Sequence, residues 1–158
     1  ELQGSWIMSA TGLCATLSGF IAAGISDRIG RKPVVVTACL LSLLTPLAAL
    51  YFNGPIFLLG ALMFIGWVGT AAFSLFMAVI PGETLPLRYV ATATGVVACM
   101  GEVAGGAWQL AGGWIADLTT LAAPIQIAAV CALGGTVLSL FLKETAPVKT
   151  GAAAAPIQ

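Results

Sequence analysis

Long apolar runs, separated by short breaks that contain polar residues, glycine or proline, make up almost the whole chain. Five runs meet the length of a membrane span, and they cover residues 4–25, 33–52, 55–80, 90–116 and 121–142. A helix rises about 1.5 Å per residue and the hydrocarbon core of a bilayer is about 30 Å thick, so about 20 residues suffice to cross it. Strands of membrane barrels need only about 10 residues. The pattern therefore predicts five transmembrane helices.

The connections between these runs are short, which places neighbouring helices antiparallel. Because backbone groups in lipid must pair within their own segment or a closed barrel, the fold class is an all-α integral membrane protein. Pro46 lies inside the second run and predicts a kink there, since proline lacks the backbone N–H that a helix interior needs.

Composition supports a membrane protein and excludes several function classes. Of 158 residues, 59% are hydrophobic and 8% charged, and the mean hydropathy is +1.05, whereas soluble domains carry roughly 25% charged residues. The formal net charge is zero and no basic patch is present, so no nucleic-acid partner is expected. There is no histidine, and the single cysteines in apolar runs are interpreted as packing residues; we expect no metal and no cofactor. These are Cys14, Cys39, Cys99 and Cys131.

The basic residues predict the orientation. With five alternating spans, all six Lys and Arg side chains fall on one side of the membrane, which the positive-inside rule assigns to the cytoplasm. We expect a multi-pass protein of the plasma membrane. The six are Arg28, Arg31, Lys32, Arg88, Lys143 and Lys149.

The spans differ in character. The second and fifth are rich in branched residues and leucine, which suits lipid contact, whereas the fourth is rich in glycine and alanine. Gly101 and Gly105 form a GxxxG step, which allows two helix backbones to approach closely. The fourth span is therefore predicted to form a helix–helix interface.

Glu102 is the one ionisable residue deep inside a predicted span. A charge at the bilayer centre costs roughly 2.5–3.5 kcal/mol, so Glu102 is expected to face protein or a water-filled cavity. Glu102 and Gln109 are seven residues apart and share a helix face, beside which Trp108 and Gln109 can line a cavity. Two interpretations stay open: a carboxylate that couples protons or binds substrate, or a structural hydrogen bond between helices.

Charges of both signs gather in two breaks on the predicted cytoplasmic side. Asp27 and Arg31 are four residues apart, and Glu83 and Arg88 flank Pro86 in the other break. Asp27 can also lie at the N-terminus of the second span, where a negative charge is favourable. The charges form either an ion-pair gate between helix ends or plain topogenic signals. No motif of an enzyme active site is present, so no enzymatic activity is expected.

Four segments resemble the major facilitator superfamily. Asp27-Arg28-Ile29-Gly30-Arg31-Lys32 resembles its signature loop, D-R-x-G-R-[RK], with Ala23 where the family pattern has glycine. Residues 81–95 are similar to the loop between helices ten and eleven, residues 112–117 to the end of helix eleven, and residues 143–147 to the stretch after helix twelve. The chain thus aligns with helices eight to twelve.

This resemblance implies a partial general-substrate-transporter fold and a secondary transporter of small solutes that works by alternating access, with a substrate site between two halves. It assigns Asp27, Arg28, Gly30, Arg31, Lys32, Glu83 and Arg88 to a cytoplasmic gating loop. Organic anions or sugar acids are the substrates it suggests, carried as a symporter with H⁺. The expected partners are the lipid bilayer, the small-molecule substrate and a missing N-terminal half.

The resemblance also divides the chain. Residues 1–144 would form a partial C-terminal six-helix bundle, and residues 145–158 a disordered cytoplasmic tail. The alternative is a truncated or half-size membrane subunit that does not transport. Five helices cannot enclose a cavity between two halves, so we expect no transport by these residues alone.

Overall fold

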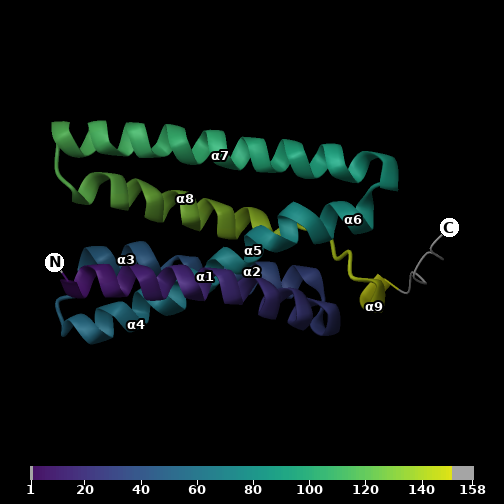
Figure 1. The fold of residues 1–158 in the computed structure, drawn as a ribbon, viewed down its shortest axis with the longest axis horizontal. Helices are drawn as coiled ribbons and strands as arrows, with labels where there is room; N and C mark the ends of the chain where they lie inside the picture. The colour runs from purple at the N-terminus through teal and green to yellow at the C-terminus, as the bar shows by residue number, and fades with distance from the viewer. Residues whose placement is uncertain (1, 151–158) are drawn as a thin grey trace.

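The structure is a computed structural model that describes residues 2–150, and these form helices without any strand (Figure 1). The helices run up and down in one elongated bundle. Its first hairpin consists of α1 (Leu2–Ile29), α2 (Arg31–Ser42) and α3 (Leu44–Tyr51). The middle of the chain forms α4 (Ile56–Trp67), η1 (Val68–Thr70), α5 (Ala71–Ser74), η2 (Leu75–Val79) and α6 (Ile80–Thr84). It ends with α7 (Leu87–Leu118), α8 (Ala122–Leu140) and α9 (Pro147–Thr150).

All five predicted spans are helical. The first lies within α1, the fourth within α7 and the fifth largely within α8, while the second and third are helical paths with internal breaks. Four helical stretches among the described residues are long and apolar enough to cross a membrane: 31–51, 56–84, 87–118 and 122–140. An all-α membrane protein is therefore confirmed.

The breaks within the second and third spans have local causes. The second span breaks at Leu43, three residues before Pro46, because proline offers no N–H to the preceding turn. The kink predicted from Pro46 is thus present. The third span passes through a 3₁₀ turn at η1 and a π-helical turn at η2, and such turns alter helix direction without ending the helix.

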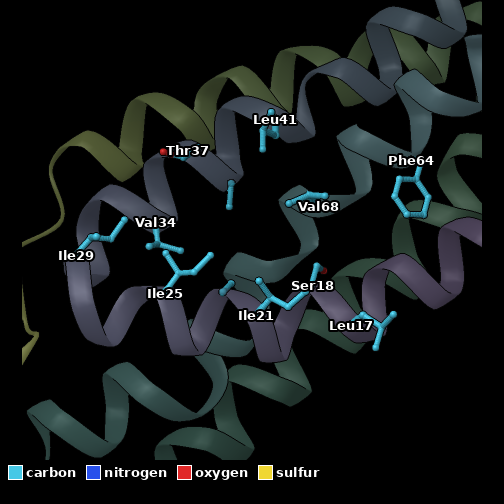
Figure 2. A pocket seen from close by; sticks show the side chains of 12 residues that line it. Leu17, Ser18, Ile21, Ile25, Ile29, Val34, Thr37, Leu41, Phe64 and Val68 are labelled. Carbon is cyan, nitrogen blue, oxygen red and sulfur yellow. The ribbon is translucent and has the colours of Figure 1, made fainter.

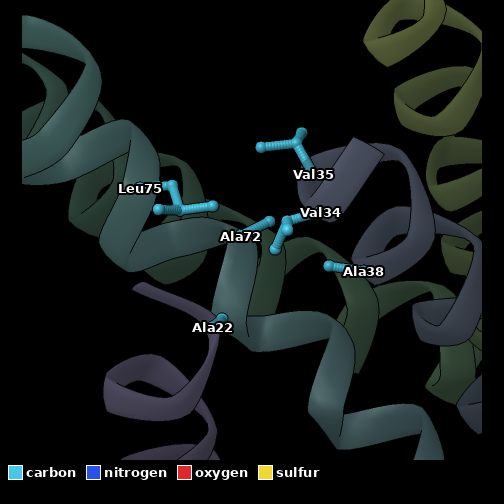
Figure 3. Close-up of a cluster of buried hydrophobic side chains, with 6 residues drawn as sticks. All are labelled: Ala22, Val34, Val35, Ala38, Ala72 and Leu75. Carbon is cyan, nitrogen blue, oxygen red and sulfur yellow. The ribbon is translucent and has the colours of Figure 1, made fainter. Parts of the chain in front are cut away.

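The hairpin of α1 and α2 packs against the third span. In Figure 2, apolar side chains of α1 and α2 face each other across a groove whose far wall includes Val68 of η1. Next to it, Figure 3 shows the buried core, to which α1 contributes Ala22, α5 contributes Ala72 and η2 contributes Leu75. From α2 come Val34, Val35 and Ala38. Since α2 supplies half of this core, the second span has a buried face in addition to the lipid contact that its composition suits.

The closest helix contacts occur at two glycines that the sequence reading did not single out. A Cβ atom at Gly69 would lie 2.6 Å from the carbonyl oxygen of Ala38 and 2.7 Å from the backbone nitrogen of Ser42. At Gly66 it would lie 2.8 Å from the backbone nitrogen of Thr45 and would overlap that residue's hydroxyl. The third span therefore touches the backbone of α2 and α3, which only glycine permits.

Helix α7 lies along one side of the bundle (Figure 1), where its packing partners are α8, α6 and η2. Most of its side chains are exposed, and Gly112 alone is buried among them. A Cβ atom at Gly95, Gly105 or Gly106 would meet nothing within 4 Å. The glycine-rich face of the fourth span thus has no helix packed against it within residues 2–150.

The alternation of the helices places all six Lys and Arg residues at one end of the bundle, where α1 meets α2, α6 meets α7 and α8 ends (Figure 1). We call this the charged end. In the segment after α8, Ala146 is fully buried and α9 follows it. Most of the tail expected from residue 145, residues 151–158, lies outside the described residues, and its disorder stays a prediction.

Candidate functional site

Three segments far apart in the sequence meet at the charged end. They are the turn between α1 and α2, the short helix α6, and the stretch that follows α8. Arg31, the first residue of α2, lies between them and is 6% exposed. The group around it, which we call the Arg31 cluster, consists of Ser26, Asp27, Arg31, Glu83, Glu144 and Thr145.

The guanidinium of Arg31 binds the carboxylate of Glu83 through two of its nitrogens. Nη2 of Arg31 donates to Oε1 of Glu83 at 2.6 Å, and Nε donates to Oε1 at 3.1 Å and to Oε2 at 3.2 Å. The side chains are 8% and 17% exposed. A two-nitrogen contact of this kind fixes orientation as well as charge. It joins the start of α2 to α6, which lies 52 residues further along the chain.

The third guanidinium nitrogen of Arg31 is held by α1. Nη1 donates to the hydroxyl of Ser26 at 2.5 Å and lies 2.6 Å from Oδ1 of Asp27. Ser26 is fully buried, and its hydroxyl in turn donates to the carbonyl of Ala23 at 2.8 Å. Asp27, in contrast, is 64% exposed. The predicted pairing of Asp27 with Arg31 is present, but water screens it more than the pair with Glu83.

Glu144 closes the N-terminus of α2. Its Oε1 accepts the backbone N–H of Arg31 at 2.7 Å, and its Oε2 accepts that of Lys32 at 3.2 Å. These N–H groups need an outside acceptor, because Gly30 precedes the helix and has no side chain to supply one. Gly30 has φ 109°, and a Cβ there would lie 2.5 Å from Oε2 of Glu144. Glycine is therefore required both for the turn and for the carboxylate's approach.

The carboxylate of Glu144 is stabilised in its charged form. Partial burial acts to raise its pKa, but the backbone N–H groups of Ala146, Arg31, Lys32 and Thr145 all donate to it and outweigh the burial. The pKa of Glu144 consequently lies below its usual range. A negative charge at this helix start also meets the positive end of the helix dipole.

Thr145 links the two carboxylates into one network. Its hydroxyl donates to Oε2 of Glu83 at 2.9 Å, while its backbone N–H donates to Oε1 of Glu144 at 3.0 Å. The segment after α8 therefore contacts both α2 and α6. The Arg31 cluster joins three helix ends at one end of the bundle.

The structure brings together some of the predicted gating residues and leaves others apart. Asp27, Arg31 and Glu83 form the cluster, and Gly30 shapes its turn. Lys32 contributes a backbone N–H. Within the described chain, the side chains of Arg28 and Lys32 form no ion pair, and the guanidinium of Arg88 lies 4.6 Å from the ring centre of Tyr89 instead.

Three members of the cluster were missed as site residues: Ser26, Glu144 and Thr145. The helix start that lacks a capping side chain at Gly30 was a signal that a distant acceptor is needed. We expected Asp27 at the N-terminus of the second span, but Asp27 belongs to the last turns of α1 and Glu144 occupies that position. The sequence favoured Asp27 because it is the nearer carboxylate, and spacing along the chain does not reveal that Glu144 contacts Arg31 from 113 residues away.

Glu102 and Gln109 lie on the exposed surface of α7. None of the described side chains donates a hydrogen bond to Glu102 or pairs with it, so a partner for this carboxylate is not found within residues 2–150. The neighbouring Trp108 lines a cavity of about 500 Å³ with Thr45 and Pro46 of α3 and Pro124 of α8. Neither Glu102 nor Gln109 is among its lining residues, so a cavity shared by Trp108 and Gln109 beside Glu102 stays a prediction.

The GxxxG step of α7 makes no close helix contact within the described chain. A Cβ at Gly101 would lie 3.6 Å from the ring of Phe73, an ordinary contact, and one at Gly105 would meet nothing within 4 Å. Packing of Gly101 and Gly105 against another helix stays a prediction, and that helix would lie outside residues 2–150. Among residues 2–150, no group of three or more His, Cys, Asp or Glu side chains could hold a metal ion.

Comparison with known proteins identifies the family of the chain. The family model of the Major Facilitator Superfamily matches residues 1–156, which is nearly the whole sequence. No curated protein matches it.

Proposed function

Since this chain belongs to the Major Facilitator Superfamily, a family of membrane transporters, we propose that it forms the C-terminal part of a secondary transporter that works by alternating access. Such a transporter exposes one substrate site to the two sides of the membrane in turn. One end of the protein must therefore close while the other opens. The site proposed to control closure is the Arg31 cluster.

The observation that carries this proposal is the asymmetry of the bundle ends. At the charged end, α2, α6 and the segment after α8 are joined through Arg31, Glu83, Glu144 and Thr145. At the opposite end, the connections at 52–55 and 119–121 have no ion pair among the described residues. Ion pairs that hold one end together stabilise the state in which that end is closed. With this end in the cytoplasm, the cluster favours the outward-facing state.

The strength of the cluster suits a gate. Charge-assisted hydrogen bonds contribute about 1.5–3 kcal/mol each when shielded, whereas an exposed pair such as Asp27 with Arg31 contributes about 0–1 kcal/mol. Moving a two-state equilibrium from 1:99 to 99:1 takes about 5.5 kcal/mol. A cluster of this size shifts the balance between two states without locking either one.

The second half of the proposal concerns the substrate. Glu102 and Gln109 lie on the face of α7 that has no packing partner in residues 2–150. We place this face toward the preceding half of the transporter, where the substrate site lies. A carboxylate there repels organic anions and sugar acids unless it binds a proton, which favours symport of such a solute with H⁺. The plasma membrane is the proposed location.

The alternative is a truncated or half-size subunit that does not transport, in which case the native protein itself shows no uptake. A substitution in the loop tests the gate. Asp27→Asn in the full-length protein removes one ligand of Arg31 while leaving a similar shape. We expect slower uptake into proteoliposomes with an unchanged amount of folded protein in the membrane. Asp117→Asn, which changes a carboxylate at the opposite end of α7, is the matched control and should leave uptake unchanged.

Unchanged uptake in Asp27→Asn leaves Asp27 and the loop cations as topogenic signals only, and the gate is then rejected. Residues 1–158 reconstituted alone provide a second test. We expect no uptake from them, because five helices do not enclose a site between two halves. Uptake by these residues alone contradicts the proposed role as the C-terminal part of a larger transporter.

A further inference from the structure

A groove lies between α1 and α2, and residues of the third span close its far side. It has a volume of about 430 Å³, and Leu17, Ile21, Ile25 and Ile29 of α1 form one wall, while Val34 and Leu41 of α2 form the other (Figure 2). We call it the α1–α2 groove. Leu17 and Ile21 are each 60% exposed, so the groove is open to the surroundings of the bundle.

The length and depth of the groove match one leaflet of a bilayer. From Leu17 to Ile29 the wall extends about 18 Å along the axis of α1, and half of the hydrocarbon core is about 15 Å. Ile29 is the last residue of α1 and lies at the charged end. The groove therefore begins where the membrane surface is expected and ends near the bilayer centre.

The lining offers an apolar partner only. Thr37 is among the few polar residues on its walls, and its hydroxyl already donates to the carbonyl of Pro33 at 2.8 Å. Val68 closes the far side with another aliphatic side chain (Figure 2). A long apolar chain fits this lining without leaving a polar group unpaired.

A cation lies at the mouth of the groove. Arg28 is three residues after Ile25 and seven after Ile21, which places it on the same face of α1. Arg28 is exposed and forms no ion pair in the described chain, because the carboxylates nearby bind Arg31 and the start of α2. A guanidinium binds phosphate oxygens through paired N–H groups. The groove thus combines an apolar channel of leaflet depth with an anion-binding side chain at the surface.

We propose that the α1–α2 groove binds an anionic glycerophospholipid, with one acyl chain along the groove and the headgroup phosphate at Arg28. This inference does not depend on the gate proposed above. Since α1 and α2 carry Ser26 and Arg31, a lipid seated between them contacts the two helices that the Arg31 cluster joins. The occupant would thereby stabilise the hairpin.

For the test, the full-length protein is purified in detergent and then incorporated into nanodiscs of phosphatidylcholine with or without phosphatidylglycerol. Native mass spectrometry counts the lipids that stay bound. We expect phosphatidylglycerol to be retained about five-fold over phosphatidylcholine, from the known attraction of one cation to an anionic headgroup. Arg28→Gln should abolish the preference and Arg28→Lys should restore most of it.

Lys32→Gln is the matched control, because it removes one charge from the same turn. Lys32 lies two residues before Val34, which is about 200° around α2, so it is on another face of the helix than the groove wall. The Lys32→Gln variant should keep the preference. Ile21→Trp fills the groove and should lower retention of both lipids, whereas Leu13→Trp, on the same helix and 67% exposed but outside the lining, should not.

The proposal is overturned by equal retention of both lipids by the unaltered protein, by equal effects of Arg28→Gln and Lys32→Gln, or by retention that Ile21→Trp does not change. Competition by inorganic phosphate or glycerol phosphate at millimolar concentration indicates a headgroup site without a bound chain, and that also rejects it. No retained lipid at all means that another segment of the protein occupies the groove.

Discussion

Arg31 and Glu83 form the most shielded ion pair of the described chain, with Nη2 and Oε1 2.6 Å apart. Arg31 also pairs with Asp27 at the same distance, yet Asp27 is 64% exposed and Glu83 only 17%. Equal distances therefore do not mean equal energies, because water screens the pair with Asp27 more than the pair with Glu83. The difference separates a structural tie between α2 and α6 from a weaker contact that can open readily.

The first prediction follows from this difference. In a double-mutant cycle, Arg31→Gln and Glu83→Gln should show a coupling free energy of about 1–3 kcal/mol. The cycle of Arg31→Gln with Asp27→Asn should give less than about 1 kcal/mol. The measurement is thermal unfolding of the purified protein in detergent, followed by far-ultraviolet circular dichroism. Equal coupling free energies in the two cycles would show that burial does not make the pair with Glu83 stronger than the pair with Asp27.

The second prediction concerns Glu144, whose carboxylate accepts the first N–H groups of α2. Glu144→Ala leaves those groups without an acceptor and should lower the free energy of unfolding by about 1 kcal/mol. Glu144→Asp has a shorter side chain, and its free energy of unfolding should lie between those of the unaltered protein and Glu144→Ala. Lys143→Ala changes the neighbouring residue without removing a cap and serves as the control.

The same carboxylate gives the cap a defined dependence on pH. The pKa of Glu144 in the folded protein is lowered, so its contribution is fully present above the unfolded pKa of about 4.3. It is lost as pH falls through the still lower folded pKa. The stability difference between the unaltered protein and Glu144→Ala should stay constant from about pH 5 to 8 and shrink below about pH 4. A difference that shrinks near neutral pH would contradict this assignment.

The third prediction concerns the glycines that set helix spacing. Gly69→Ala places a Cβ 2.6 Å from the carbonyl oxygen of Ala38, and backbone atoms cannot move aside as a side chain can. Overpacking of this kind costs about 1–3 kcal/mol. Gly134→Ala in α8, where a Cβ meets nothing within 4 Å, should be neutral or stabilising, because alanine favours the helix. Thermal stability of the two variants in the same detergent gives the comparison, and equal melting temperatures would show that the contact is not tight.

These residues show which parts of the structure the sequence could predict. Run length and apolar content predicted all five helical spans, because crossing a bilayer imposes both properties on any helix. The i to i+4 spacing predicted the contact of Asp27 with Arg31, since helix geometry fixes it. Glu144 and Gly69 were missed because their partners are distant in sequence. Glycine density pointed to Gly101 and Gly105, but density alone does not identify which glycines meet a backbone.

The last prediction concerns Glu102, which lies exposed on α7 and has no partner among residues 2–150. If it couples protons to transport, Glu102→Gln in the full-length protein should remove the pH dependence of uptake or weaken substrate affinity, while thermal stability stays within about 0.5 kcal/mol, as for a surface substitution. A structural hydrogen bond to another helix predicts the reverse: lower stability with pH dependence and affinity kept. Asp117→Asn, also exposed on α7 but in its last turn, should change neither property. Uptake into proteoliposomes across a range of pH and unfolding in detergent measure these two properties. A carboxylate that faces lipid would cost several kcal/mol. A Glu102→Gln variant that gains stability with unaltered uptake would therefore place Glu102 at the lipid surface rather than toward a substrate site.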